Sequence, residues 1–143
     1  MSAAGDCPPD CAFCAIIDSA RPAAVVASDD AAVAFLDARP VFKGHVLVVP
    51  RAHVVTLTDL PLPAIGPYFT SVQKVARAVE VGLEADGTFV AMNNKVSQSV
   101  AHLHTHVVPR RRKDGLRGFF WPRTTYADDA ERDGYAARIR GAL

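Results

Sequence analysis

Three histidines, His102, His104 and His106, stand at alternate positions, and the residues between them are apolar or β-branched. This alternation is typical of a β-strand, in which positions i, i+2 and i+4 face the same side. The strand rise predicts that the three imidazoles share one face at spacings of about 6.6–6.8 Å. A row of three imidazoles can bind a metal or carry out nucleophilic chemistry.

Two chemistries use such a row. Three histidines can hold zinc with a fourth position open for an activated water, which would make a metal-dependent hydrolase. Alternatively, one neutral imidazole attacks phosphorus while its neighbours donate hydrogen bonds to phosphate oxygens. Gln98, Ser99 and the pair Asn93-Asn94 supply neutral donors just upstream, whereas no carboxylate lies close by to act as a base for metal-bound water. The residues therefore favour phosphoryl chemistry, and the zinc hydrolase stays open as the alternative.

The composition predicts one globular domain over residues 1–143. The chain has 143 residues, of which 50% are apolar and 22% are charged, enough apolar material for one core. A formal net charge of +1 gives no overall field for nucleic acid or anionic membrane. No apolar run approaches the ~18 residues of a membrane span, and no signal-peptide pattern is present. We expect a cytoplasmic protein without a membrane segment.

The elements before the histidines are short. A helical hook is expected at Cys11–Ile17, and strands are expected at Ala24–Ala27, Ala32–Leu36 and His45–Val49, joined as an antiparallel meander.

The remaining elements make the fold class α+β. Apolar residues recur with helical period over Ile65–Leu83, which predicts one long helix. Strands are expected at Thr88–Met92 and Val100–Pro109, the second with Leu103, Thr105 and Val107 facing the core. A C-terminal helix is expected after a helix-capping Asp128.

The histidine segment resembles the signature of the histidine triad (HIT) nucleotide hydrolases and transferases. The match covers Gln98-Ser-Val-Ala-His-Leu-His-Thr-His-Val-Val-Pro-Arg110, and Cys11–Ile17, Ala34–Asp37 and Gly44–His53 resemble the other family blocks in the same order. The resemblance spans roughly residues 11–112 and leaves 113–143 as a tail. It implies an antiparallel sheet of about five strands, one long helix, a C-terminal helix and a two-fold homodimer.

The resemblance also implies roles for the site residues. His104 would attack the α-phosphorus of a nucleotide and form a covalent nucleotidyl-histidine, which water then hydrolyses. His106 would bind the phosphate, Ser99 would hydrogen-bond the phosphate or the leaving group, and His45 would add a further imidazole.

The nucleotide itself would contact four more residues. Asp37 corresponds to the residue that accepts hydrogen bonds from the ribose hydroxyls, Asn93 or Asn94 to an asparagine at the phosphate, and Gln98 lies beside Ser99. The implied enzyme is a nucleotide hydrolase or nucleotidyl transferase that releases a nucleoside monophosphate, expected to be AMP, from a phosphoramidate or a dinucleoside polyphosphate. A nucleotide-binding module with little turnover is a third hypothesis.

A Cys11-x2-Cys14 pair raises the question of a metal. By itself the pair is redox-active, metal-binding or incidental. The resemblance adds His53 and His102 to it, which implies a closed Cys2His2 structural zinc. Cys7 matches no part of the pattern and is expected to be an exposed thiol.

Three features depart from the pattern or lie outside it. The loop Lys95-Val-Ser97 is short and has no glycine, and Thr105 stands where the family usually has an apolar residue. A run of basic residues at Arg110–Lys113 precedes the aromatic residues Phe119, Phe120 and Trp121. Such a mixture could bind single-stranded nucleic acid, but a basic rim beside a polyphosphate site explains it more simply.

Overall fold

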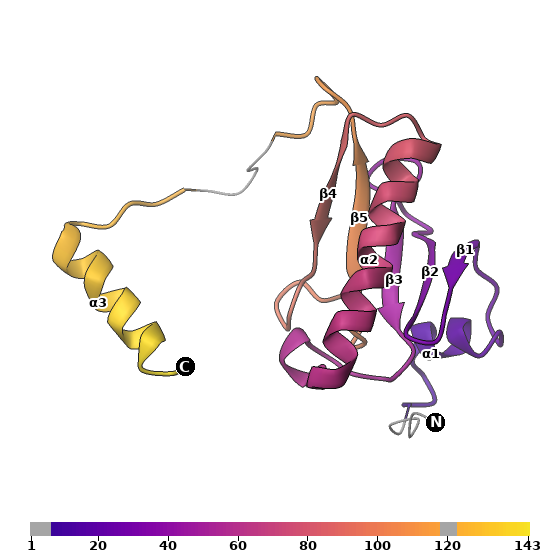
Figure 1. Cartoon of the computed structure of the whole chain (residues 1–143), viewed down its shortest axis with the longest axis horizontal. Coiled ribbons are helices and arrows are strands. Elements are labelled where there is room, and N and C mark those ends of the chain that lie inside the picture. The colour runs from indigo at the N-terminus through magenta and orange to yellow at the C-terminus, as the bar shows by residue number, and fades with distance from the viewer. Residues whose placement is uncertain (1–6, 118–122) are drawn as a thin grey trace.

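The computed structural model describes residues 7–117 and 123–143, and its architecture is α+β (Figure 1). The elements in chain order are α1 (Ala12–Ile17), β1 (Val25–Ser28), β2 (Ala32–Leu36), β3 (Val46–Pro50), the short 3-10 helix η1 (Leu57–Asp59), α2 (Leu62–Gly82), β4 (Gly87–Ala91), β5 (Thr105–Arg110) and α3 (Asp129–Arg140). Each helix and strand expected from the sequence is present, and most boundaries move by one to three residues.

The five strands form one antiparallel sheet in the order β1-β2-β3-β5-β4. The expected meander therefore ends at β3. Helix α2 then carries the chain along one face of the sheet, so that β4 forms the outer edge and β5 returns between β4 and β3 (Figure 1). Strand β5, which carries His106, is thus an inner strand that pairs with β3 on one side and with β4 on the other.

The predicted strand Val100–Pro109 is wrong at its start, because β5 begins only at Thr105. Its partner β3 ends at Pro50, and a proline has no N–H to continue the ladder. Beyond that point the Leu103 N–H donates to the Val54 carbonyl at 2.7 Å instead. His102 and His104 therefore precede the strand.

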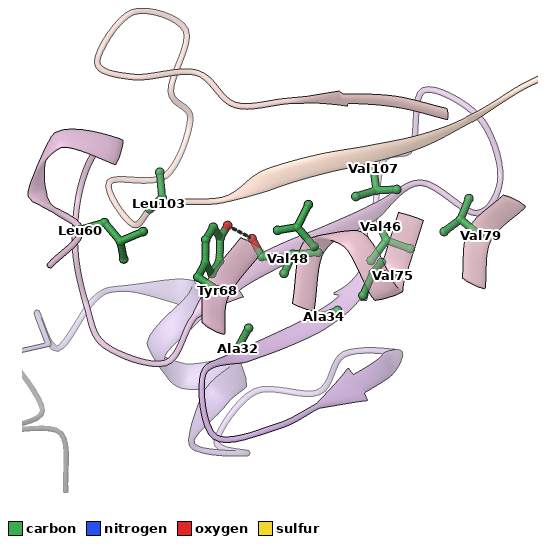
Figure 2. Packing of buried hydrophobic residues seen from close by; sticks show 11 residues of the cluster. Ala32, Ala34, Val46, Val48, Leu60, Tyr68, Val75, Val79, Leu103 and Val107 are labelled. Atoms are coloured by element: carbon green, nitrogen blue, oxygen red, sulfur yellow. Dashed lines mark hydrogen bonds between the residues drawn. The ribbon is translucent and has the colours of Figure 1, made fainter. Parts of the chain in front are cut away.

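One face of the sheet is closed by α2. Its buried cluster includes Val48 of β3 and Leu103 and Val107 of the histidine segment (Figure 2). Tyr68 of α2 donates its hydroxyl hydrogen to the Val48 carbonyl at 2.8 Å and lies 2.7 Å from the Thr105 hydroxyl. The expectation that Leu103, Thr105 and Val107 face the core is confirmed. The polar Thr105 is tolerated there because its hydroxyl forms a hydrogen bond with the Tyr68 hydroxyl.

The opposite face of the sheet is closed in part by α1. Phe13 of this helix packs with Phe35 of β2 and with apolar residues of β3. The Phe13 ring also lies edge-on to His102 and His104, at centroid distances of 6.0 and 5.1 Å. The histidine side chains therefore point to the α1 face, away from α2.

The basic run after β5 is engaged by the domain. Arg110 pairs with Asp114 at 2.6 Å. Arg111 donates to the carbonyls of Leu83 and Glu84 at the C-terminal end of α2, at 2.6 and 2.7 Å. These two cations stabilise the end of a helix and a turn.

Helix α3 lies apart from the sheet and buries no residue (Figure 1). It begins as predicted, because the Asp128 carboxylate accepts the Glu131 N–H at 2.8 Å. The aromatic residues Phe119, Phe120 and Trp121 lie outside the described residues. In the described residues, no helix is both long enough and apolar enough to cross a membrane.

Candidate active site

His104 has one ring nitrogen fixed and the other open. It is 3% exposed, and its Nδ1 lies 2.8 Å from the His102 carbonyl. A carbonyl only accepts, so Nδ1 carries the proton and Nε2 carries the lone pair. His104 Nε2 makes no hydrogen bond within the described residues. Every fully buried side-chain nitrogen or oxygen of these residues has a hydrogen-bond partner, so Nε2 must be exposed to solvent. A neutral imidazole in this tautomer is a competent nucleophile.

His106 is held in the opposite tautomer by a short chain of hydrogen bonds. The Val41 backbone N–H donates to His45 Nδ1 at 3.1 Å, so the proton of the neutral His45 ring is on Nε2. His45 Nε2 lies 2.9 Å from His106 Nδ1, which therefore accepts. The remaining proton of His106 is on Nε2, and this nitrogen can donate a hydrogen bond to a phosphate oxygen.

Burial favours the neutral forms of His106 and His45. The pKa of the half-buried His106 is lowered to about 4, mainly by burial and in smaller part by the neighbouring His104 and His45. Burial also lowers the pKa of His45, and the Asp37 carboxylate, 3.7 Å from His45 Nδ1, opposes that shift in part. Near pH 7, His106 and His45 therefore act as neutral hydrogen-bonding groups.

Asp37, His45 and His106 bring three possible metal ligands within 4.8 Å of one another. The nitrogens that face each other inside this group are already joined by the His45–His106 hydrogen bond, and His45 Nδ1 accepts from a backbone N–H. The group therefore works as a hydrogen-bond relay. The Asp37 carboxylate accepts the Arg39 N–H at 2.9 Å and is half-buried at the end of the relay.

The predicted polar donors divide into two kinds. Both ends of the Gln98 amide are used, since it donates to the Val55 carbonyl at 2.6 Å and accepts from Lys95 N–H at 2.9 Å. Asn94 accepts the Leu57 N–H at 2.7 Å and holds its loop. In the described residues, the side chains of Asn93 and Ser99 make no such bond and are exposed. Gln98 therefore shapes the loop, while Asn93 and Ser99 are free to meet a ligand.

The loop between them contains left-handed residues without glycine. Lys95 has φ 69° and Ser97 has φ 59°, a region that favours glycine. Two hydrogen bonds hold these residues in that conformation. The Leu57 N–H donates to the Asn94 side chain, and the Lys95 N–H donates to the Gln98 side chain.

The four residues that the resemblance implied for zinc lie together. His53 Nδ1 is 3.1 Å from His102 Nδ1, and Cys14 Sγ is 3.5 Å from His53 Nδ1. His102 Nδ1 is 3.6 Å from the Sγ atoms of both Cys11 and Cys14. A tetrahedral zinc with ordinary bond lengths places two nitrogens about 3.3 Å apart and a sulfur and a nitrogen about 3.6 Å apart. These separations fit one zinc ion at their centre.

The His102 tautomer also suits a metal. Its Nε2 lies 2.8 Å from the Pro50 carbonyl and must carry the proton, which leaves the Nδ1 lone pair facing the cysteines. Burial lowers the pKa of His102 to about 4, so the ring is neutral as a ligand must be. The same residue offers its backbone carbonyl to His104.

The prediction for Cys7 is wrong. Cys7 is half-buried and disulfide-bonded to Cys14, while Cys11 is free. The ligand atoms of Cys7, Cys11, Cys14 and His53 lie within 4.8 Å of one another. The sequence signal was a second short spacing, Cys7-x3-Cys11, which the family pattern does not use.

The alternative zinc site on the three histidines is not assembled. The metal-sized groups of ligand atoms in the described part of the chain do not include His102, His104 and His106 together. His102 faces the cysteines, whereas His106 faces His45.

The comparisons place the chain in a family. The model of the HIT domain matches residues 19–113. The protein named Protein hit, from Bacillus subtilis (strain 168), is 39% identical over 125 residues, which are 86% of this chain and 85% of that protein. The crystal structure of a HIT-family protein from Bacillus subtilis has a TM-score of 0.83 at 37% identity and covers 94% of this chain and 97% of that one. The chain belongs to the HIT family.

Other relatives carry names that bear on chemistry. A zinc-bound histidine triad family protein from Mycobacterium smegmatis has a TM-score of 0.71 at 36% identity, covering 94% of this chain and 98% of that one. An adenylylsulfatase of Arabidopsis thaliana is 30% identical, covering 75% of this chain and 55% of the enzyme. A bis(5'-adenosyl)-triphosphatase of Saccharomyces cerevisiae is 34% identical, covering 66% of this chain and 48% of the enzyme. Members of the family thus include hydrolases of adenylyl compounds.

Proposed function

We propose that this protein is a nucleotide hydrolase or nucleotidyl transferase that releases AMP from a phosphoramidate or a dinucleoside polyphosphate through His104. The observation that carries the proposal is the tautomer of His104, whose Nδ1–H is bound by a carbonyl and whose Nε2 is open. The hydrolases among its relatives support the same reaction class.

In the proposed reaction, the lone pair of His104 Nε2 attacks the α-phosphorus. The bond from phosphorus to the leaving nitrogen or oxygen breaks, and that atom takes up a proton from solvent or from Ser99, which is replenished by water. The positive charge on the ring is stabilised by the hydrogen bond from Nδ1 to the His102 carbonyl. Water then attacks phosphorus, breaks the phosphorus–nitrogen bond and returns the neutral imidazole with AMP as product.

The other residues bind and orient the nucleotide. His106 Nε2–H donates to a phosphate oxygen, and the relay from Val41 through His45 keeps that proton in place. Asn93 donates to a phosphate oxygen from its exposed side-chain amide, whereas the Asn94 side chain is held in its loop by the hydrogen bond that it accepts from the Leu57 N–H. Asp37 accepts hydrogen bonds from the ribose hydroxyls.

A substrate panel tests this function. Purified protein is assayed with an adenosine phosphoramidate, a diadenosine polyphosphate and adenylyl sulfate, and AMP is measured. We expect AMP from at least one compound and no AMP from the His104→Ala variant. AMP binding without turnover of any compound would instead favour the nucleotide-binding module. Chelator-sensitive turnover together with loss of the metal in His104→Ala would favour the metal-dependent hydrolase, in which His104 is a ligand.

We also propose a structural zinc on Cys11, Cys14, His53 and His102. Zinc would tie the α1 hook to the histidine segment and supply folding free energy, since these ligands come from three separate parts of the chain. The spacing of the four ligand atoms supports it, and so does the zinc-bound relative.

Metal analysis tests the zinc. Protein purified with a reductant is expected to contain one zinc per chain, and Cys11→Ser and His53→Ala are expected to lose it. His45→Ala is the control, because His45 is a buried imidazole outside the cluster. Equal zinc content in all four proteins would contradict the assignment.

We also propose a homodimer, because the β4 edge of the sheet and the adjacent surface of α2 expose apolar side chains. Strand β4 is an outer strand, and its Val90 is 45% exposed. Helix α2 beside it exposes Ile65 and Phe69, each at 36%. Pairing of these surfaces with a second copy would extend the sheet and cover the apolar side chains. Light scattering is expected to give twice the chain mass for the wild type and the monomer mass for Val90→Lys; a wild-type monomer would contradict it.

A further inference from the structure

The cysteine–histidine cluster holds one sulfur more than a tetrahedral metal needs. Cys11, Cys14, His53 and His102 already supply four ligand atoms at separations that fit zinc. Cys7 lies within 4.8 Å of three of them and is bonded to Cys14. Five possible ligands therefore share a site with four coordination positions.

The chain before α1 brings this fifth ligand to the site. The Cys11 N–H donates to the Pro8 carbonyl at 3.0 Å, which closes a tight turn directly after Cys7. The Cα atoms of Cys7 and Cys14 are 6.5 Å apart, within the range that a disulfide spans without backbone movement. Cys14 is thus placed to bond either to zinc or to Cys7.

We propose that Cys7 and Cys14 form a thiol–disulfide switch that controls metal loading of this cluster, an inference that rests on the proposed zinc site. In the reduced protein Cys14 is a thiolate ligand. In the oxidised protein its sulfur is bonded to Cys7, and the cluster keeps only Cys11, His53 and His102 as ligands. Three ligands without a second thiolate bind zinc far more weakly, so oxidation releases the ion.

The oxidant for this step is a small-molecule disulfide. The Cys7 thiolate attacks one sulfur of the small disulfide, forms a mixed disulfide and releases one small thiolate. The Cys14 sulfur leaves zinc and attacks the Cys7 sulfur, which forms the Cys7–Cys14 bond and releases the second small thiolate. The two cysteines lose two electrons, and the small disulfide gains them.

His102 connects this switch to the nucleophile. Its Nδ1 faces the cluster, while its backbone carbonyl accepts the proton of His104 Nδ1. A change in what His102 binds therefore acts on the residue that fixes the His104 tautomer.

The test is zinc release under a controlled oxidant. Zinc-loaded, reduced protein is mixed with oxidised glutathione, released zinc is read with a chromogenic chelator, and disulfides are mapped by mass spectrometry. For the wild type we expect release of one zinc per chain together with a Cys7–Cys14 disulfide. For Cys7→Ser, whose zinc ligands are intact, we expect release at least about tenfold slower, because its remaining thiols are bound to the metal.

Two results would overturn the switch. Equal release from the wild type and Cys7→Ser would remove Cys7 from the step, and so would a Cys11–Cys14 disulfide as the product. Cys7→Ala is measured in parallel, and circular dichroism reports whether both variants are folded. AMP release by the reduced protein is assayed separately, so that a failure of the switch and a failure of the proposed enzyme are distinguished. Reduced protein that binds no zinc would overturn the zinc site and the switch together, and would leave the proposed enzyme to the AMP assay.

Discussion

The two sides of the histidine segment are built on opposite principles. Leu103, Thr105 and Val107 face α2, where they are fully or almost fully buried and where the only polar group of the three is bonded to Tyr68. The three histidines face α1, and each has one nitrogen bound by a carbonyl or another imidazole. On the α2 side the one polar side chain, Thr105, has its hydrogen-bond partner within the fold. On the α1 side the second nitrogen of each imidazole ring is left for a ligand.

This difference teaches how one short segment both stabilises and reacts. The α2 side fixes the backbone. The Pro50 carbonyl then determines the tautomer of His102, and the His102 carbonyl determines that of His104. Substitutions on the α2 side should therefore change stability without changing chemistry, whereas substitution of His104 or His106 on the α1 side should change the chemistry.

The largest effect is expected from His104→Ala. Removal of the proposed nucleophile should lower kcat for AMP release by at least about a thousandfold. Thr105→Val, the next residue on the other side, is the matched control and should keep kcat within about threefold, because its hydroxyl meets only Tyr68. Steady-state kinetics check both, and equal losses in the two variants would erase the distinction between the sides.

A smaller loss is expected from His106→Ala. This variant lacks the Nε2–H proposed to bind the phosphate, and loss of one such donor usually lowers kcat by about 10²–10³-fold. The nucleophile stays, so the covalent intermediate should still form, only more slowly, in a quenched-flow measurement. Wild-type rates for this variant would mean that the relay from His45 to His106 serves structure alone.

On the α2 side, Tyr68→Phe should change stability. The variant leaves the Val48 carbonyl and the Thr105 hydroxyl buried with one partner fewer, which lowers the free energy of unfolding by about 1–3 kcal/mol. Urea denaturation measures this, and a double-mutant cycle with Thr105→Val isolates the pair. Unchanged stability would contradict the separation of roles. So would a loss of kcat that, expressed as a free energy of activation, exceeds the loss in the free energy of unfolding.

The weakest expected effect is the pH dependence of stability. The unfolded chain protonates His106 below about pH 6.5, whereas the folded chain does so only near pH 4. Between these values the unfolded state binds more protons, so stability is complete above pH 6.5 and falls as the pH drops toward 4, by at most about 1.4 kcal/mol per pH unit for this ring.

The control for that measurement is His106→Gln, whose unfolding free energy should fall less steeply over the same range. Tyr68 on the α2 side does not contribute to this pH dependence, because its pKa is about 12, far above the range. Parallel curves for the wild type and the variant would show that His106 is not held neutral by the fold.

Much of this arrangement is predictable from sequence because it depends on periodicity. Alternation placed Leu103, Thr105 and Val107 in the core, and the caps and apolar stripe predicted α2 and α3. The start of β5 was not predictable from its own residues, because it is set by Pro50 on another strand. A long-range contact, the hydrogen bond from the Gln98 amide to the Val55 carbonyl, also decides that Gln98 holds the loop, and the local pattern carries no signal for it.

The most direct test of the central claim is to trap the covalent intermediate and locate it. The protein is mixed with an adenosine phosphoramidate, quenched under conditions that preserve phosphorus–nitrogen bonds to histidine, and sequenced by tandem mass spectrometry. We predict one adenylyl group, attached to His104, and none in His104→Ala. An adenylyl group on His106 or His102, or turnover without any adduct on His104, would contradict the account.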